Sequence, residues 1–347
     1  MENVIYGFNQ LRKEDNEKVG KKCANLGELT QAGFRVPPGF AVPLEAYTRF
    51  MNETGLIARI EDFLSSFQLD PNNAANMPRY EEVSSTIRKM VEETEPPSDI
   101  GLAIREHYEA MCEVTGVDAV PVATRSAGPA SHPGQYESYL HIRGSSEVIR
   151  NVIKVWSSTF NTRSLISRAR HGLSLAYDPI GVAVLKMVDA KAAGVMFTVN
   201  PADGDSSKYY IESNWGFGES VVAGEVTPDS FLVDKATSEI LTRTISPKTV
   251  WYVVDPKTGQ VASQTVPEDK QNASSLNDEE VLELTRLGGL IEDHFNVPQD
   301  IEWAVDSSLD FPESIVLLQT RPITTEVQKK SPTDRIIDLM IRGISGT

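Results

Sequence analysis

Two short segments near the C-terminal end of the chain carry polar side chains at alternate positions. Asp300 and Glu302 are two residues apart, as are Gln319 and Arg321, and an apolar run of strand type, 314–318, leads into the second pair. Because successive side chains of a strand point to opposite faces, each pair would lie on one face. Carboxylate and amide oxygens are hard ligands that suit Mg²⁺, and an adjacent arginine suits a phosphate. By themselves, these residues favour equally a metal-and-phosphate site and a solvated hairpin with surface charges.

The composition limits what the chain can be. Its 347 residues are enough for two or three packed units, and 40% hydrophobic residues is ordinary for a globular protein. The net charge, 33 − 49 = −16, argues against a broad nucleic-acid-binding or anionic-membrane surface. No apolar run reaches the length of a membrane span, and the N-terminus lacks a signal-peptide pattern. The two cysteines, Cys23 and Cys112, offer neither a disulfide framework nor a metal spacing, so we expect a reducing, cytoplasmic location.

The first half of the chain predicts helices around a few strands. Residues 21–29 predict a short amphipathic helix that stops at Gly33, and 55–115 predict helices whose apolar stripes are core. A strand over 120–126 and another over 136–142 flank a loop rich in Gly, Pro and Ser. Such a loop could lay backbone N–H groups over phosphates, although alone it is more often just a hairpin. Residues 147–171 predict a further helical segment.

The second half predicts mainly sheet. Five or six strands are expected between residues 180 and 254, followed by a helix over 277–295 whose acidic start complements the helix dipole. We therefore expect two subdomains, 1–186 with a helical insertion and 187–325, and then a tail or linker, 326–347.

Six ordered blocks of the sequence together resemble one family. They run from about Gly7 to Arg321, nearly the whole chain, and they resemble the nucleotide-binding domain of phosphoenolpyruvate synthase and pyruvate phosphate dikinase. The blocks are Gly20–Leu29 with Val36–Phe40, Arg125-Ser126, Gly134–Leu140, Gly194–Thr198 with Pro201, Trp215–Glu219 with Gly224 and Pro228-Asp229, and Asp300–Ala304 with Leu318–Pro322. The resemblance implies an α+β fold of the ATP-grasp type, with ATP held between two subdomains.

The resemblance also implies roles for individual residues. Lys22, Arg125 and Arg321 would neutralise phosphates; the residues alone do not separate Lys22 from Lys21, and the family pattern selects Lys22. Glu302 and Gln319 would hold Mg²⁺. The other nucleotide-binding positions would be Gly134, Gln135 and Ser138 in the phosphate loop, Met187 and Val188 at the adenine edge, Asp300 in support, and Thr198 and Glu219. For Glu219, a structural turn is as strong an expectation.

Two departures from the family pattern matter. The span from Ala127 to Pro133 is short and almost uncharged, so the loop over the phosphates would differ. Relatives continue into a domain with a phosphorylated histidine and then a substrate-binding barrel. None of the five histidines of this chain has the Thr- and Gly-rich setting of that acceptor; they are His107, His132, His141, His171 and His294.

The resemblance therefore implies an ATP-dependent, dikinase-type phosphotransferase subunit. It would cleave ATP to AMP and phosphate and pass a phosphoryl group to a histidine on a second subunit, which would carry the acceptor site. A free-standing arrangement of this kind resembles the ATP-binding subunit of phenylphosphate synthase, whose acceptor is phenol. Two alternatives stay open: an excised N-terminal domain of a pyruvate,water dikinase or of an antibiotic-phosphorylating relative, and a nucleotide-sensing subunit without turnover. No nucleic-acid or membrane partner is expected.

Overall fold

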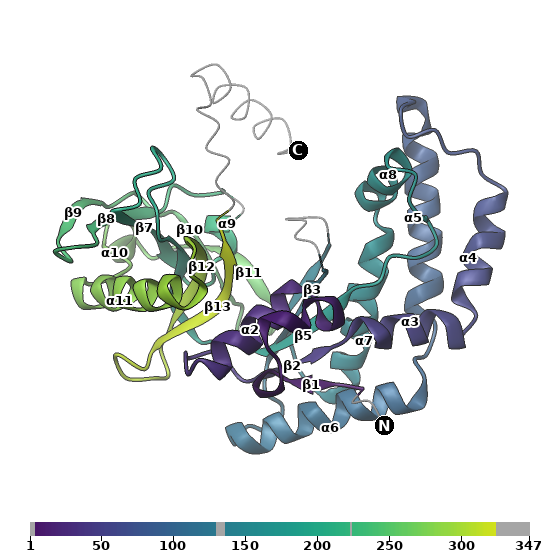
Figure 1. The fold of residues 1–347 in the computed structure, drawn as a ribbon, viewed down its shortest axis with the longest axis horizontal. Coiled ribbons are helices and arrows are strands. Elements are labelled where there is room, and N and C mark those ends of the chain that lie inside the picture. The colour runs from purple at the N-terminus through teal and green to yellow at the C-terminus, as the bar shows by residue number, and fades with distance from the viewer. Residues whose placement is uncertain (1–3, 130–135, 223, 324–347) are drawn as a thin grey trace.

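The computed structural model describes residues 4–129, 136–222 and 224–323. Two antiparallel sheets lie side by side, with most of the helices gathered at one end of the molecule and one long helix at the other (Figure 1). None of the described helices is both long and apolar enough to span a bilayer. The α+β character expected from the sequence is confirmed.

The five-stranded sheet belongs to the first half of the chain and has the strand order β1-β2-β5-β3-β4. Every neighbouring pair in it is antiparallel. Its strands are β1 (Tyr6–Gly7), β2 (Gly39–Val42), β3 (Val122–Ala127), β4 (Ser138–Ile142) and β5 (Gly181–Lys186).

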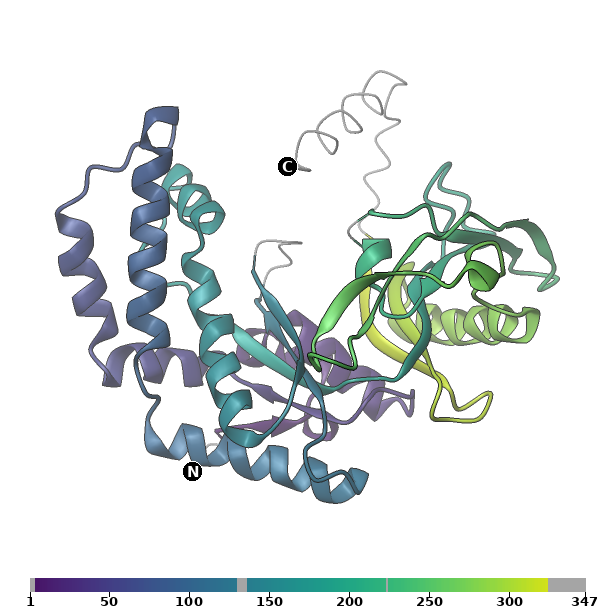
Figure 2. The ribbon, with the colours of Figure 1, turned by 180° about the vertical axis from the view of Figure 1, so that it is seen from behind.

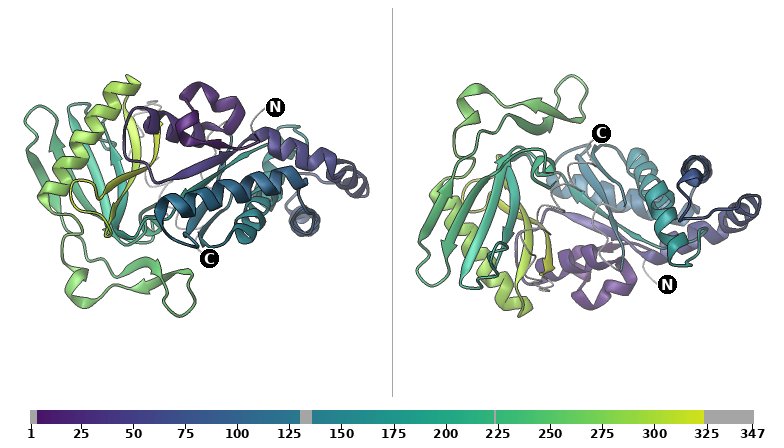
Figure 3. Two further views of the ribbon diagram at one scale, coloured as in Figure 1. Left: turned by 90° about the horizontal axis from the view of Figure 1, so that it is seen from below. Right: turned by 90° about the horizontal axis from the view of Figure 1, so that it is seen from above.

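The six-stranded sheet belongs to the second half and has the order β13-β12-β6-β7-β8-β9, again antiparallel throughout. Its strands are β6 (Ala190–Phe197), β7 (Lys208–Trp215), β8 (Asp229–Asp234), β9 (Ile240–Thr244), β12 (Gln299–Asp306) and β13 (Ile315–Pro322). A separate hairpin, β10 (Val250–Val254) with β11 (Val261–Thr265), projects from this sheet (Figure 3).

Helices cover the outer faces of the sheets. The amphipathic helices of the first half pack their apolar stripes into one large core, in which Tyr47, Phe50 and Trp156 are in ring contact. Figure 2 shows this helical layer from behind. Its members are α3 (Leu44–Glu53), α4 (Leu56–Ser65), α5 (Met77–Glu92), α6 (Ser98–Thr115), α7 (Ser145–Ser157) and α8 (Thr162–Arg170). Shorter elements are η1 (Phe8–Gln10), η2 (Lys13–Asp15), α1 (Asn16–Val19), η3 (Ala74–Asn76), η4 (Ser158–Phe160), α9 (Glu219–Val222) and α10 (Glu268–Gln271).

The segment predicted to be helical over 147–171 is helical, but it is interrupted between α7 and α8. The hydroxyl groups of Ser157, Ser158 and Thr159 each donate to a carbonyl three residues earlier. Such bonds compete with the regular helical pattern. Asn161 then caps a new helix, since its side chain accepts a hydrogen bond from Ser164 N.

Helix α11 (Asp278–Phe295) covers the outer face of the six-stranded sheet. It begins at a capping box, in which the side chains of Asn277 and Glu280 each accept a hydrogen bond from the other's backbone N–H. Its buried residues pack against Ile301 and Trp303 of β12 in a second core. Because Ile301 and Trp303 face α11, the opposite face of β12 is the one available to bind a ligand.

Helix α2 (Lys21–Gln31) connects the two sheets. Leu26 packs with residues of β3 and β5, whereas Leu29 packs in the core beneath α11. Asn25 Nδ2 donates to the carbonyl of Thr320 in β13 at 2.7 Å, and Glu28 pairs with His294 of α11. The helix ends as predicted, with Gly33 at φ +82° and Phe34 N bonded to Leu29 O.

The last strand of the first sheet ends at Lys186 and the first strand of the second begins at Ala190. A division into subdomains 1–186 and 187–325 follows this arrangement, and we keep it as a proposal. The tail, 326–347, lies outside the described residues.

Candidate functional site

The hairpin of β12 and β13 brings the two polar pairs of the sequence together. Asp300 lies opposite Arg321, and Glu302 lies opposite Gln319. Since Ile301 and Trp303 face α11, the polar residues at alternate positions face the other side of the sheet, towards β3. The register shifts at Glu302, where Leu318 is the extra residue of β13. This bulge places Leu318 and Gln319 on the same face.

Two ion pairs organise this face. Arg321 is bonded to Asp300 Oδ2 through Nε at 2.7 Å and lies 2.6 Å from it through Nη2. Arg125, from β3 of the other sheet, donates from Nη2 to Glu302 Oε2 at 3.0 Å. The second pair joins residues that are 177 positions apart, so it crosses from one sheet to the other. Each guanidinium keeps further N–H donors, because arginine has five of them.

Lys22 enters the same place from the first turn of α2. The helix starts at Gly20, whose positive φ of 81° and close approach to the carbonyl of Ala127 leave no room for a side chain. Lys21 N then donates to Gly128 O at 2.9 Å. The sequence thus docks the start of α2 onto the end of β3, beside Arg125.

The charges of this cluster perturb one another. Burial, together with Arg125 and Arg321, lowers the pKa of Lys22 to about 8, although Glu302 opposes the shift. Burial disfavours the ionised form of Glu302, but Arg125 and Lys22 outweigh it and hold its pKa below the usual value. Burial raises the pKa of Asp300 despite its ion pair with Arg321. No acceptor among the described residues takes a hydrogen bond from the ammonium of Lys22.

Two of the buried oxygens that lack a partner within the described part of the chain lie near Glu302. They are Gln319 Oε1 and Glu219 Oε2. Buried polar atoms are almost always paired, so each unpaired one needs an explanation. Burial also raises the pKa of Glu219. Both atoms are hard donors, as is the carboxylate of Glu302, which faces Gln319 across the hairpin. Such a donor set fits Mg²⁺.

The described residues contain no group of three or more His, Cys, Asp or Glu side chains arranged to hold a metal ion. Mg²⁺ is usually bound through one or two carboxylates together with phosphate oxygens of a ligand. The carboxylate of Glu302 and the unpaired oxygen of Gln319 fit this way of binding.

A cavity of about 490 Å³ opens between the two sheets beside this cluster. Arg125, Glu219 and Glu302 lie at its polar part, while Met187 and Val188 lie just after the end of β5. The rest of its wall is largely apolar and includes Leu140, Leu185, Phe217 and Leu318. A cavity of this volume, apolar with a few convergent polar groups, is typical of sites for small molecules and cofactors.

The predicted residues fall into three groups. Arg125, Ser138, Met187, Val188, Glu219 and Glu302 line the cavity. Four more adjoin it through the ion pairs, the electrostatic cluster or the hairpin register: Lys22, Asp300, Gln319 and Arg321. The third group does not meet the cavity in the described residues. Thr198 is fully buried on the α11 side, near Gly288, with its Oγ1 accepting from Gln299 N. Gly134 and Gln135 lie outside the described residues.

Sequence reasoning missed the network that holds Glu219. Asn214 donates from Nδ2 both to Ser220 Oγ at 2.8 Å and to Val250 O at 2.9 Å, so one buried amide joins β7, α9 and β10. No sequence pattern identifies Asn214, because the sequence does not distinguish a buried asparagine side chain from a solvated one. The apolar lining by Phe217 and Leu318 was also not anticipated, although both lie inside the recognised blocks.

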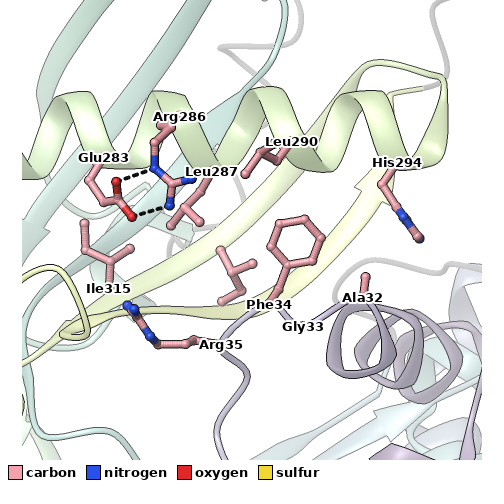
Figure 4. A pocket seen from close by; sticks show the side chains of 11 residues that line it. Ala32, Gly33, Phe34, Arg35, Glu283, Arg286, Leu287, Leu290, His294 and Ile315 are labelled. Atoms are coloured by element: carbon pink, nitrogen blue, oxygen red, sulfur yellow. Dashed lines mark hydrogen bonds and ion pairs between the residues drawn. The ribbon is translucent and has the colours of Figure 1, made fainter.

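A second cavity, of about 370 Å³, lies between α11, β13 and residues 32–35 (Figure 4). Its polar groups have partners: Arg286 bonds to Glu283, as Figure 4 shows, Arg35 to Glu313 and His294 to Glu28. It holds no group that is both buried and unpaired in the described residues. This cavity lacks the features that mark the first one as a site.

None of the four described histidines lines the larger cavity. The Nδ1 atoms of His107 and His171 bond to carbonyls of their own helices, and that of His141 bonds to Gly259 O. His294 pairs with Glu28. His132 lies outside the described residues.

Comparison with known proteins assigns the chain to a family. The model of the pyruvate phosphate dikinase AMP/ATP-binding domain matches residues 16–338. The chain is similar to two probable phosphoenolpyruvate synthases. The protein of Methanocaldococcus jannaschii is 37% identical, and the match covers 99% of this chain and 29% of that protein. The protein of Methanothermobacter thermautotrophicus is 38% identical, and the match covers 98% of this chain and 49% of that protein. The phosphoenolpyruvate synthase of Aeropyrum pernix is 35% identical over 98% of this chain and 46% of its own.

The chain thus spans about half or less of the length of these curated relatives. The match covers the cavity and every strand of the two sheets except β1, and the expectation of an ATP-grasp-like α+β fold is confirmed. The chain belongs to the family of pyruvate phosphate dikinase AMP/ATP-binding domains.

Proposed function

We propose that this ATP-binding domain holds Mg²⁺-ATP in the cavity between the sheets and cleaves it to AMP and phosphate, passing a phosphoryl group to a histidine on a partner subunit. The observation that carries the proposal is the meeting of Lys22, Arg125 and Arg321 with Glu302 and Gln319 at one end of an otherwise apolar cavity. The apolar walls suit a nucleobase, and the charged end suits its phosphates.

In this proposal the protein acts by position and charge. Phosphoryl transfer needs little covalent help from the enzyme, and catalysis depends on alignment and on neutralising the charge of the phosphoryl group. Lys22, Arg125 and Arg321 would supply that positive charge. Glu302 and Gln319 would hold Mg²⁺, which would supply further neutralisation of the phosphate charge. Met187 and Val188 would offer backbone groups at the base edge, and Ser138 would contact the phosphates.

The acceptor is proposed to be a histidine outside the described cavity. All four described histidines lie away from it and have backbone or side-chain partners. Phenol, as in phenylphosphate synthase, is the small molecule that we propose for the final step. A cytoplasmic location is compatible with Cys23 and Cys112, which are free and buried.

A second candidate is favoured by the comparisons. The similar proteins are named phosphoenolpyruvate synthases, and this chain matches only part of their length. The domain could therefore serve pyruvate phosphorylation, with the histidine-bearing domain in the same chain. Assays with phenol and with pyruvate, each supplied with the cognate histidine-bearing protein, distinguish the two acceptors.

Titration calorimetry with ATP, with and without Mg²⁺, tests the proposed function. We expect ATP binding that strengthens with Mg²⁺ in the wild-type chain, and a loss of the Mg²⁺ dependence in Glu302→Gln. The matched control is Glu313→Gln, because Glu313 also pairs with an arginine but lies on the surface. Absence of nucleotide binding at millimolar concentration would overturn the proposal.

A phosphorylation experiment tests the transfer step. After incubation with ATP labelled at the β- or γ-phosphate, we expect acid-labile label on a histidine-bearing partner and none retained on this chain. Label retained on this chain and lost in His132→Ala would show that the acceptor histidine lies here.

A further inference from the structure

A charge pair in the helical layer reaches the edge of the cavity. Arg88, on α5, donates from both Nη atoms to the two carboxylate oxygens of Glu137, at 2.6 and 2.8 Å. Tyr139 donates its hydroxyl to the same carboxylate, and Glu92 lies 3.7 Å from Arg88 Nε. A bidentate pair of planar groups fixes orientation as well as distance. Glu137 is thus held rigidly by the helical layer.

Ser138, the residue after Glu137, belongs to the candidate site. Ser138 begins β4, lines the cavity and lies opposite Arg125 in the strand register. The backbone N–H of Glu137 also donates to Ser158 Oγ at 3.2 Å. Both the side chain and the main chain of Glu137 are therefore anchored one residue before a cavity-lining position.

Strand β4 needs such an anchor more than the other strands around the cavity do. It is the edge strand of its sheet and pairs only with β3, and that pairing is irregular between Val122 and Thr124. None of its residues is fully buried, although Tyr139 and Ile142 pack against the first core from its surface. His141, further along β4, adopts a positive φ of 58°. A strand with one neighbour and a broken register is free to shift unless side chains fix it.

From this geometry we propose that Arg88 and Glu137 are positioning residues that fix the start of β4, and with it Ser138, against the phosphate end of the nucleotide. The inference rests on the proposed function, because it concerns the same cavity. Neither residue touches the cavity itself. Both act through β4, and the helical insertion would thereby contribute to phosphate binding without contacting ATP.

Burial opposes the ionisation of Glu137, but the hydrogen bonds from Arg88 and Tyr139 outweigh it and keep its pKa below the usual value. The carboxylate therefore stays charged at neutral pH and the pair stays bidentate. Replacing Glu137 by glutamine keeps the size of the side chain but allows only one acceptor oxygen to face the guanidinium.

Binding of two ligands by the full chain tests the proposal. Dissociation constants for Mg²⁺-ATP, from calorimetry, and for adenosine, from ligand-observed NMR, are measured for the wild type, Glu137→Gln and Arg88→Met. We expect ATP affinity to fall by about tenfold in both variants, the lower end of what loss of an orienting partner costs. Adenosine affinity should not change, since adenosine has no phosphates to be placed by β4.

A matched control comes from the same helical layer. Arg49 of α3 makes a similar two-point contact with Asp99 of α6, at 2.7 and 3.1 Å, and neither residue lines the cavity. Arg49→Met should leave both affinities unchanged. The exchange variant Arg88→Glu with Glu137→Arg restores a pair of opposite charge and should recover part of the ATP affinity, whereas a role in stability alone predicts no difference between the two ligands.

The outcomes separate the two proposals. If the wild type binds ATP and the Glu137 and Arg88 variants bind it equally well, the positioning role is wrong and the proposed function stands. If ATP and adenosine affinities fall together, the pair merely stabilises the fold and the positioning role is also wrong. If the wild type binds no ATP, the proposed function fails first.

Discussion

Two ion pairs of the molecule, Arg125–Glu302 and Lys248–Asp229, show how differently opposite charges can be used. Lys248 and Asp229 are both fully buried and lie 2.5 Å apart. The carboxylate of Asp229 also accepts from Ser246 N, Ser275 N and Ser275 Oγ, and Lys248 donates to Ser246 O as well. Arg125 and Glu302 remain partly exposed and lie beside two buried oxygens without partners in the described residues.

The difference separates a structural pair from a site. At Asp229 every lone pair has a donor, so the group is closed and can only hold β8 against the segment that leads into β10. At Glu302 the donors and acceptors are left incomplete next to a cavity. Buried polar groups left unpaired cost free energy, and such sites persist where a ligand completes them. The number of buried polar atoms without a hydrogen-bond partner therefore distinguishes the two clusters better than their charge or burial does.

The largest expected effect is on stability, at the closed pair. Lys248→Met removes one partner and leaves the carboxylate of Asp229 buried and uncompensated, so we expect the free energy of unfolding to fall by about 3–5 kcal/mol. Urea unfolding followed by circular dichroism measures it. The double variant Lys248→Met with Asp229→Leu should lose less than the single variant, because no buried charge remains.

A pair on the surface provides the control. Lys208 and Asp234 are paired but each side chain is 20% exposed, so Lys208→Met should lower the free energy of unfolding far less than Lys248→Met does. Equal losses in Lys248→Met and Lys208→Met would contradict the distinction between the two kinds of pair.

In the cluster around Arg125 and Glu302, we expect substitutions to lower the rate of ATP cleavage and to leave the free energy of unfolding unchanged. Arg321→Ala and Lys22→Ala each remove positive charge from the phosphate end, and loss of one such donor typically costs about 10²–10³-fold in rate. AMP formation from ATP, in the presence of the histidine-bearing partner, measures the rate, and the unfolding midpoint checks the fold. Lys21→Ala is the matched control, because Lys22, and not Lys21, interacts with the charges of Arg125, Glu302 and Arg321. Wild-type turnover in Arg321→Ala would refute the role.

The smallest effect concerns pH. Burial, together with the charge of Arg125, lowers the pKa of Lys22 to about 8. Bound phosphates favour the charged ammonium and would raise this pKa. ATP affinity should therefore be constant below pH 8 and fall above it, by at most about tenfold per pH unit. Calorimetry in buffers of different ionisation enthalpy should detect proton uptake near pH 8. Lys22→Met should abolish both effects, and the same pH profile in that variant would assign the titration elsewhere.

The sequence predicted the parts of the site that follow local rules. Alternation placed Asp300 and Glu302 on one face, and the strand after 314 brought Gln319 and Arg321 to them, as β12 and β13 show. The residue types and the recognised blocks named Arg125 and Glu302, which meet across the two sheets.

What the sequence could not predict depends on contacts between distant residues. The bulge at Leu318 is a feature of the pairing between β12 and β13 and leaves no mark in the sequence of β13. Asp229 and Lys248 look like ordinary charged residues, and only the assembled fold buries them. Thr198 sits within a recognised block, yet its strand turns it towards α11. Local patterns give the face of a strand, whereas burial and partners are properties of the whole chain.

Helix α2 has a mechanical consequence. Leu26 packs in one core and Leu29 in another, and Asn25 is bonded to Thr320 of the opposite sheet. Any rotation of one sheet relative to the other that preserves these contacts must turn about an axis close to this helix. Lys22, in its first turn, lies close to that axis, whereas the contact of His141 in β4 with Gly259 O, between β10 and β11, lies away from it and would have to break or move. The phosphate end would keep its geometry while the mouth of the cavity opens and closes.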